Sequence, residues 1–437
     1  MRFKININNR EIIFFVVLFM MFILRDFKGI NISISLYFLW CLIVMPFLDC
    51  ETLIGFGISM CLYTQALQTS LILLSICLLL IVKSNKLYFR FSSFVFLGLL
   101  IWELLHAFIQ PFDFEEYRRF LFVGFFIVLT IAYINSQTIK LEKVINVYLV
   151  NCSFAMFDIL LQYMNYLKSF SIMDVIECKY RFGNMFILNS EIGYCIYDNE
   201  NYIAFFVLLA LVCSIYLYKN CYKTIYLFSF FYFVLFGLMT RSKAFSICLV
   251  VLIISLIPLN DITKSIKRIK LLYSFMVSIL IVLIVFLSKN YILNLVNNIL
   301  NRFETTSLTT GRSYIASEYF DYFFSHVVYM VFGIGLQANT EKTGIDKSMH
   351  NGFQEILVCW GIVGIVIFLI WIFALIYEIS HDNVKVLLIQ IILLISIFMF
   401  LYSIQYITKP QIFITTVLYY MILRNDKLNY KKDNNYE

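Results

Sequence analysis

The amino-acid sequence predicts an all-α polytopic membrane protein with about 12–14 transmembrane helices and two long external loops. Of its 437 residues, 62% are apolar and only 14% are charged. Soluble domains have about 45–50% apolar and about 25% charged residues. The chain has only 4 prolines and 15 glycines, so few helix breaks are expected. This composition excludes a soluble globular enzyme, a disordered chain and a water-filled outer-membrane barrel.

Long apolar runs define the predicted spans. They lie at 12–24, 30–48, 52–82, 91–109, 120–134, 144–166, 202–218, 224–239, 244–259, 271–288, 353–377, 386–407 and 411–423. The first run is short and no small-residue cleavage site follows it, so we interpret it as an uncleaved span. Run 52–82 is too long for one span, because about 31 residues of helix reach about 46 Å against a hydrocarbon core of about 30 Å. It is tilted, broken near residues 65–68, or folded as two short helices.

Basic residues in the short loops predict the orientation, because lysine and arginine favour the cytoplasmic side. Loop 83–90, loop 260–270 and the tail 424–437 are basic, and even numbers of runs separate them. All three clusters therefore fit on the cytoplasmic side. An odd number of runs separates the basic N-terminus from loop 83–90. Two passes within run 52–82, or one early run outside the membrane, would resolve this conflict.

This orientation puts two long polar segments outside the cytoplasm, 167–201 and 289–352. The second is far longer than a usual helix connection of about 2–8 residues, and long loops often carry function. Cys178 and Cys195 lie in the first loop, either as a disulfide in an oxidising compartment or as two free thiols. With these loops, residues 1–437 form a single membrane domain.

The large loop ends in His350 and Asn351, directly before an apolar helix. Asn351 is a favourable N-cap, and Gln354 follows three residues later, as in a capping box. The positive end of the helix dipole disfavours an imidazolium, so His350 is expected to be neutral and able to accept a proton. The alternative is a histidine that only stabilises the loop near the lipid headgroups.

Earlier in the same loop, apolar residues at offsets of three and four predict an amphipathic helix after Arg312, and its aromatic side chains place it in the membrane interface. These residues are Tyr314, Ile315, Tyr319, Phe320, Tyr322, Phe323, Phe324, Val327 and Val328. The segment 332–335 then ends the helix. Arg312 falls in the first turn, where a cation is unfavourable for the dipole. It either binds a phosphate through its guanidinium or extends to the lipid headgroups.

Further cations lie on the predicted outer side. The turn from Thr240 through Arg241 to Lys243 joins two runs there, against the usual preference of basic residues for the cytoplasm. Two cations on the disfavoured side suggest an anionic partner. In loop 167–201 the mixed charges are typical of a solvated loop, except for Arg181.

Some polar residues lie inside apolar runs. Glu103 and His106 are one turn apart, either as a hydrogen-bonded pair that stabilises the bundle or as a proton relay or glycan contact. The same alternatives hold for Asp158. Glycine pairs at 55/57 and 361/364 predict close helix packing. The sequence shows no cofactor motif and no metal-ligand cluster, so no cofactor and no metal are expected.

Together these motifs resemble the C-terminal signature of the O-antigen polymerase (Wzy type) and O-antigen ligase superfamily. The signature runs from Gly311-Arg312 through a loop helix and the segment 332–335 to His350-Asn351, with Gly361 and Gly364 behind it. The turn at Arg241 is similar to an outward, arginine-containing turn of that family. The resemblance covers about residues 200–423. The polymerases are similar in having two large periplasmic loops with functional arginines, and the ligases share the His-Asn and arginine elements.

The resemblance implies transfer of a glycan from an undecaprenyl-diphosphate donor to a sugar hydroxyl, at the outer face of a bacterial cytoplasmic (inner) membrane. A diphosphate leaving group needs cations, for which Arg241 and Arg312 are the candidates. The acceptor hydroxyl needs a base, for which His350 is the candidate and Glu318 the reserve. The expected substrate-binding residues are Arg181, Asn351, Glu318 and Lys243.

The leading hypothesis is a glycosyltransferase that polymerises lipid-linked repeat units in O-antigen or lipopolysaccharide biosynthesis. Its expected partners are the undecaprenyl-diphosphate-linked glycan, membrane lipid and, to be tested, a chain-length regulator protein; nucleic acid is not expected. The nearest alternative is the ligase that attaches finished glycan to lipid A core. A lipid-linked glycan flippase is less favoured, because the long external loop and the lack of repeat-related halves argue against it. A structural or assembly subunit is the remaining alternative.

Overall fold

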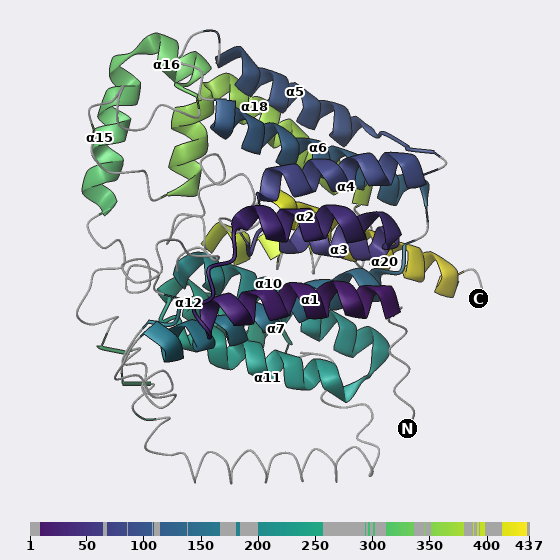
Figure 1. Ribbon diagram of the computed structural model, residues 1–437. Helices are drawn as coiled ribbons and strands as arrows, with labels where there is room; N and C mark the ends of the chain where they lie inside the picture. Colours follow the sequence, from purple (N-terminus) through teal and green to yellow (C-terminus); the bar gives the residue numbers. More distant parts are fainter. Residues whose placement is uncertain are drawn as a thin grey trace.

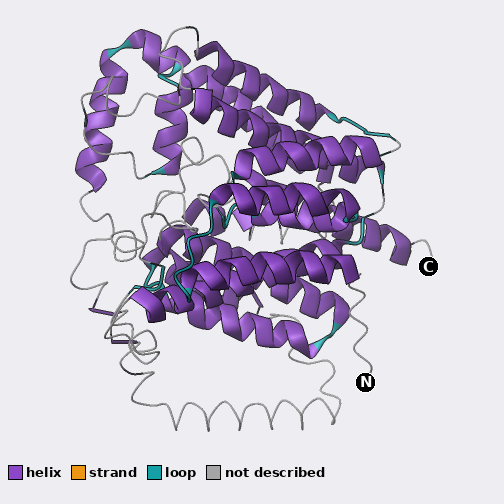
Figure 2. Ribbon diagram, in the orientation of Figure 1, coloured by secondary structure: helices purple, strands orange, loops and turns teal. Residues whose placement is uncertain are grey.

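The computed structural model confirms an all-α membrane protein, because the described part of the chain contains helices and no strand (Figure 2). The structure describes residues 9–63, 68–84, 86–106, 108, 114–137, 139–166, 181–183, 200–256, 312–335, 345, 351–379 and 413–434, with isolated positions within 293–301 and 388–397.

The helices follow the predicted apolar runs, with a few differences given below. They are α1 (Asn9–Asp26), α2 (Ile34–Val44), the 3-10 turn η1 (Met45–Phe47), α3 (Cys50–Ser59), α4 (Thr69–Lys83), α5 (Phe91–His106), α6 (Phe114–Ser136), α7 (Leu141–Tyr166), α10 (Glu200–Cys221), α11 (Thr224–Met239), α12 (Lys243–Leu256), α15 (Arg312–Ser325), α16 (Val327–Phe332), α18 (Gly352–Ile379) and α20 (Ile414–Asn434).

Most of these helices run side by side in one bundle, and α15, α16 and the first part of α18 stand across one end of it (Figure 1). We call this end, with Arg181, Arg241 and Asn351, the loop end. Both chain termini lie towards the opposite end (Figure 1). We call that end, with Arg90 and Arg424, the tail end.

Four of the described helices are long and apolar enough to cross a membrane. They lie at Tyr117–Ser136, Leu141–Met164, Glu200–Cys221 and Gly352–Ile379. Shorter apolar helices lie at Ile34–Phe47, Cys50–Ser59, Thr69–Lys83, Phe91–His106, Thr224–Met239 and Lys243–Ile253. The predicted run 271–288 and most of run 386–407 lie outside the described residues, so the number of spans stays a prediction.

The basic loop 83–90 and the C-terminal helix meet at the tail end. The Arg424 guanidinium donates to the carbonyl of Ile134 and, at 2.7 Å, to the side chain of Asn135. The backbone N–H of Tyr88 donates to the carbonyl of Ala132, 3.2 Å away. Because 132–135 is one turn of α6, the loop and the tail lie on the same side of the bundle, as the orientation argument requires. Loop 260–270 lies outside the described residues.

Run 52–82 forms two helices, which removes the conflict at the N-terminus. Lys83, at the end of α4, donates from its ammonium to the carbonyl of Leu48, just before α3. The start of α3 and the end of α4 therefore lie at the same end of the bundle. Lys143 lies there too, because its ammonium donates to the carboxylate of Asp49, the residue after Leu48. It is also 2.5 Å from the Glu11 carboxylate of α1. The N-terminus and loop 83–90 consequently share the tail end.

Asp158 is fully buried on α7, where it hydrogen-bonds the side chain of Asp26. Asp26 also accepts from Gln162 at 3.1 Å and forms an ion pair with Arg25 at 3.3 Å. Burying a carboxyl in a bundle is unfavourable unless it is hydrogen-bonded. These contacts therefore favour the structural interpretation of Asp158, in which it ties α1 to α7.

Candidate active site

The turn between α11 and α12 holds Arg241 in a left-handed backbone conformation, with a φ of 53°. Its N–H donates to the carbonyl of Leu238 at 2.9 Å. The buried Thr240 side chain donates to the carbonyl of Gly237 at 2.6 Å. Lys243 begins α12 directly after the turn. The turn is therefore fixed by local hydrogen bonds, and two cations lie within three residues at the loop end.

Arg181 of the first long loop binds this same turn. Its Nε donates to the carbonyl of Thr240 at 3.3 Å, and one terminal nitrogen donates to Asn201 at 3.3 Å. The other terminal nitrogen forms an ion pair with Glu200, whose side chain is 8% exposed. The next residue, Phe182, is fully buried and its N–H donates to the carbonyl of Met239 at 3.0 Å. Residues 181–183 thus join loop 167–201 to the Arg241 turn.

Helix α15 begins at Arg312, so Arg312 lies in the first turn as predicted. The helix packs through Ile315, Tyr319 and Phe323, which are at most 9% exposed. Glu318 lies on another face, where it accepts a hydrogen bond from the hydroxyl of exposed Tyr314. That hydrogen bond raises the pKa of Tyr314. Glu318 is thus half-buried, away from the packed face of the helix.

The apolar pattern predicted a helix as far as Val328, but α15 ends at Ser325. His326 has an extended backbone and separates α15 from α16. Val327 and Val328 therefore begin a second helix, where they are 67% and 65% exposed. The prediction of one helix that continues through Val327 and Val328 is wrong, because the extended backbone of His326 divides the segment into two helices.

Asn351 is the N-cap of α18, which confirms the prediction. Its Oδ1 accepts from the backbone N–H of Phe353 at 3.0 Å and of Gln354 at 3.2 Å. Side-chain caps of this kind satisfy N–H groups that the first helical turn leaves open. His350, the residue directly before the cap, lies outside the described residues. Since Asn351 Oδ1 is used by the cap, its amide nitrogen is the group that remains for a substrate.

Helix α18 breaks at Gly361, where φ is 64° and ψ is −172°. The predicted span 353–377 therefore consists of a half-helix, 352–360, and a longer helix after the break. The half-helix stands beside α15 across the bundle (Figure 1). The N–H groups of Ile334 and Gly335 donate to the carbonyls of Val358 and Cys359, at 3.0 and 2.7 Å. They satisfy acceptors that the break leaves open.

Two glycines allow this crossing. A Cβ added to Gly333 would come within 2.5 Å of the Gly361 backbone nitrogen, and one added to Gly361 within 2.6 Å of the Phe332 carbonyl carbon. Both residues also have positive φ, of 82° and 64°. The sequence indicated close packing at Gly361, but the partner is the end of α16 and not the face of another long helix.

The last turn of α5 donates hydrogen bonds to both segments of this crossing. The Trp102 indole N–H donates to the Trp360 carbonyl at 3.2 Å, and the Trp360 indole N–H donates to the Glu103 carboxylate at 2.7 Å. His106 Nε2 donates to the Phe332 carbonyl at 2.7 Å, and its Nδ1 is 4.0 Å from Glu103. These contacts favour the structural interpretation of Glu103 and His106. We call Trp102, Glu103 and His106 the α5 bracket.

Two further cations, Arg118 and Arg119, lie in the second turn of α6 at the loop end, and sequence analysis did not select them. Arg118 is half-buried, and Phe120, two residues on, has its ring 6.1 Å from that of Trp360. The pair meets the criterion that selected Arg241, namely basic residues at an end of a span that is predicted to face outward. They join the candidates for binding an anion.

The candidate residues form two groups at the loop end (Figure 1). Arg181, Arg241 and Lys243 lie at the start of α10 and the turn before α12, whereas Arg312, Glu318 and Asn351 lie in the layer of α15 and the half-helix. In this layer, the N-terminal ends of α15 and of the half-helix point in the same direction. Helix N-termini favour anions.

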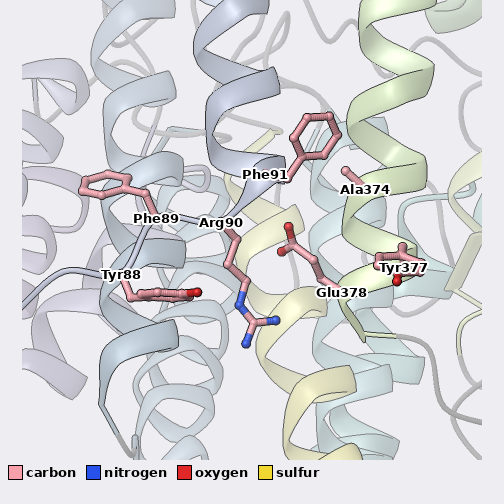
Figure 3. Close-up of a pocket in the computed structure, with 7 residues that line it drawn as sticks. All are labelled: Tyr88, Phe89, Arg90, Phe91, Ala374, Tyr377 and Glu378. Atoms are coloured by element: carbon pink, nitrogen blue, oxygen red, sulfur yellow. The ribbon is translucent and has the colours of Figure 1, made fainter.

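A cavity of about 470 Å³ lies at the opposite, tail end of the bundle (Figure 3). It is lined by residues 88–90 of the loop before α5, by Phe91 at the start of α5, and by Ala374, Tyr377 and Glu378 of α18. It contains none of the predicted site residues. We place the candidate active site at the loop end, because the candidate cations and the capped half-helix lie there.

Fold and site define a multi-pass, all-α membrane protein with a helical layer across one end. Residues 225–369 match the family model of the O-antigen ligase. This part of the chain, about a third of it, carries a domain of the O-antigen ligase and polymerase superfamily, which confirms the resemblance there. No curated protein and no solved structure matches the chain.

The matched segment contains α11, α12, α15, α16 and the half-helix, and therefore Arg241, Lys243, Arg312, Glu318 and Asn351. The match supports a function of the polymerase or ligase type in surface-polysaccharide biosynthesis, with a lipid-linked glycan as substrate.

Proposed function

We propose that this protein is an O-antigen polymerase of the bacterial inner membrane, which joins undecaprenyl-diphosphate-linked repeat units at the outer face. The observation that carries the proposal is the contact between Arg181 and the Arg241 turn. It brings an arginine of the first long loop onto the matched domain. The resemblance associates two arginine-bearing external loops with the polymerases.

In the proposed reaction, a hydroxyl oxygen of the acceptor sugar attacks the anomeric carbon of the donor glycan. The new glycosidic C–O bond forms as the bond between this carbon and the diphosphate oxygen breaks. His350 takes the hydroxyl proton, and undecaprenyl diphosphate leaves with the electron pair of the broken bond. Cations stabilise the charge that develops on this leaving group, usually a large contribution to catalysis.

The residues divide these tasks between them. Arg241 and Arg312 are assigned to the diphosphate, because a guanidinium binds phosphate oxygens through two parallel hydrogen bonds. Lys243 adds positive charge beside the turn, and Arg181 holds the turn in place while a fifth of its side chain stays exposed, 21%. Glu318 and the Asn351 amide nitrogen are assigned to the sugar hydroxyls.

Deletion of the gene tests the polymerase against the ligase. Loss of a polymerase leaves a single repeat unit on the lipid A core, whereas loss of a ligase leaves none, and a glycan gel distinguishes the two. The ligase is the second candidate, because the matched family model is described by that activity. A deletion strain that shows bare core contradicts the polymerase proposal.

Complementation then tests the site. Arg241→Ala and His350→Ala are expected to restore no glycan ladder, although both proteins reach the membrane in normal amounts. Lys28→Ala is the matched control, because Lys28 is an exposed cation that follows α1 at the loop end, outside the candidate groups. A normal ladder with both site variants contradicts the assignment of these residues.

A further inference from the structure

The cavity at the tail end has aromatic side chains around its opening. Tyr88 and Phe91 are 59% and 65% exposed, and Tyr377 of α18 is 84% exposed. Large exposed aromatic residues near the end of a membrane-spanning helix are typical of the boundary between hydrocarbon and headgroups. The cavity therefore opens where phospholipid headgroups and upper acyl chains meet the protein.

Arg90 is half-buried in this cavity and takes no hydrogen-bond or ion-pair partner for its guanidinium among the described residues. The nearby Glu378 carboxylate is already engaged. Its two oxygens accept from the Ser92 backbone N–H at 2.9 Å and from the Ser92 hydroxyl at 2.8 Å. Figure 3 shows this carboxylate pointing towards the start of α5, whereas the guanidinium of Arg90 points away from it.

The charges around the cavity favour an anion. Arg90, Arg424 and Glu378 all lie close enough to Tyr420 to act on it electrostatically, so two cations face one carboxylate. The Arg424 guanidinium is bound to Ile134 and Asn135, which leaves Arg90 as the cation available to a ligand among these groups. Lys83 and Lys86 of the same loop add positive charge at this end. Basic clusters beside membrane spans attract anionic lipid.

We propose that the tail-end cavity binds an anionic phospholipid of the surrounding bilayer. The lipid phosphate pairs with the Arg90 guanidinium, because the planar fork of an arginine matches two phosphate oxygens. The upper acyl chains lie against Phe91 and Tyr377. This site is at the opposite end from the candidate active site, so it is independent of the proposed function.

Native mass spectrometry of the purified full-length protein tests the proposal. The protein is titrated with phosphatidylglycerol and, separately, with diacylglycerol of the same acyl chains, which lacks the phosphate. We expect the wild type to retain phosphatidylglycerol in preference to diacylglycerol. Arg90→Ala is expected to weaken this retention by about tenfold, the size of one charge-assisted hydrogen-bonded pair. Lys86→Ala is the matched control, because Lys86 is an exposed cation of the same loop outside the cavity.

Three results would overturn the proposal. Equal retention by the wild type and Arg90→Ala removes the role of the guanidinium. Equal binding of diacylglycerol indicates an apolar groove without a phosphate site. Displacement of the lipid by millimolar inorganic phosphate indicates a soluble phosphate ligand in place of a lipid.

A second pair of variants tests the site if Arg90→Ala does not fold. Phe91→Ala and Tyr377→Ala change exposed side chains at the opening, so the bundle should remain intact. Both are expected to weaken retention of long-chain phosphatidylglycerol more than that of a short-chain form. Unchanged retention of both lipids contradicts the proposed position of the acyl chains.

Discussion

Arg241 has a left-handed backbone conformation, which residues other than glycine rarely adopt. Its φ of 53° costs about 1–2 kcal/mol relative to a glycine at the same position. Strain of this kind is common at functional sites, where the surrounding hydrogen bonds maintain it. An arginine at a glycine-like position therefore supports a role for its side chain.

Replacement of Arg241 by glycine separates stability from function. Arg241→Gly removes the backbone strain together with the guanidinium, so we expect equal or higher thermal stability and no glycan ladder. Arg241→Ala keeps the strain and should be the less stable of the two, with the same loss of ladder. The measurements are the melting temperature of the purified protein and the glycan gel. A glycine variant with a normal ladder shows that the side chain is not required.

The role of Glu103 is tested by removing its charge and keeping its acceptor. In Glu103→Gln the amide oxygen can still accept from the Trp360 indole N–H, so we expect normal abundance and a normal ladder. Trp360→Phe removes that donor and leaves a buried carboxylate without it, at a cost of about 1.5–3 kcal/mol. Thermal stability and the ladder are measured for both. Full abundance of Glu103→Gln with no ladder would instead indicate a proton relay.

Among the elements, the broken helix α18 determines the geometry of the loop end. Its half-helix leaves the direction of the bundle at Gly361 and stands beside α15. The break is stable because the end of α16 and the α5 bracket supply hydrogen bonds to its open carbonyls. Asn351 caps the other end of the half-helix. Both ends of the half-helix are thus fixed, and the candidate base His350 directly precedes the cap in the sequence.

The crossing of Gly333 and Gly361 makes a clear prediction about glycine substitution. Gly333→Ala and Gly361→Ala each place a Cβ against backbone atoms at positive φ, and are expected to lower stability by at least about 2 kcal/mol. Gly98→Ala on α5 is the matched control, because nothing lies within 4 Å of an added Cβ there.

Alanine at position 98 should be neutral or stabilising, by about 0.5–1 kcal/mol, because glycine is a poor helix former. Thermal unfolding of the three purified variants measures the difference. A Gly361→Ala protein as stable as Gly98→Ala contradicts the crossing.

Sequence reasoning succeeded at element level where the signal was local. The asparagine cap at 351 and the helix that begins at Arg312 depend on residues within a turn or two, and both were predicted. The break at Gly361 was not, because a glycine in an apolar run is equally typical of close packing. Its cause, the approach of Gly333, depends on a residue 28 positions earlier, which no helical period indicates.

For the whole molecule, composition and the pattern of apolar runs predicted the fold class correctly. Basic clusters also predicted correctly that loop 83–90 and the tail share one end. The contact of Arg181 with the Arg241 turn could not be predicted, because it joins segments 59 residues apart without any repeated pattern. The selection of Arg181 from its loop nonetheless identified a residue that meets the candidate site.

Accessibility of introduced cysteines tests the orientation of the molecule. Ser317→Cys lies on exposed α15 at the loop end, and Lys86→Cys lies at the tail end. We expect a membrane-impermeant maleimide to label position 317 from the periplasmic side of intact inner membranes, and position 86 only after the membranes are opened. Wild-type protein gives the background from native cysteines. The reverse pattern would place the candidate site in the cytoplasm and contradict the proposed function.

The α5 bracket joins parts of the chain that the ribosome synthesises at very different times. Its three hydrogen bonds join residues 226, 257 and 258 positions apart, so α5 enters the membrane long before its partners leave the ribosome. Until Trp360 arrives, Glu103 lacks the indole that holds its carboxylate. A chain released before this point therefore has a carboxylate in the bilayer that lacks one of its hydrogen bonds, a feature by which quality-control proteases can distinguish truncated copies from finished ones.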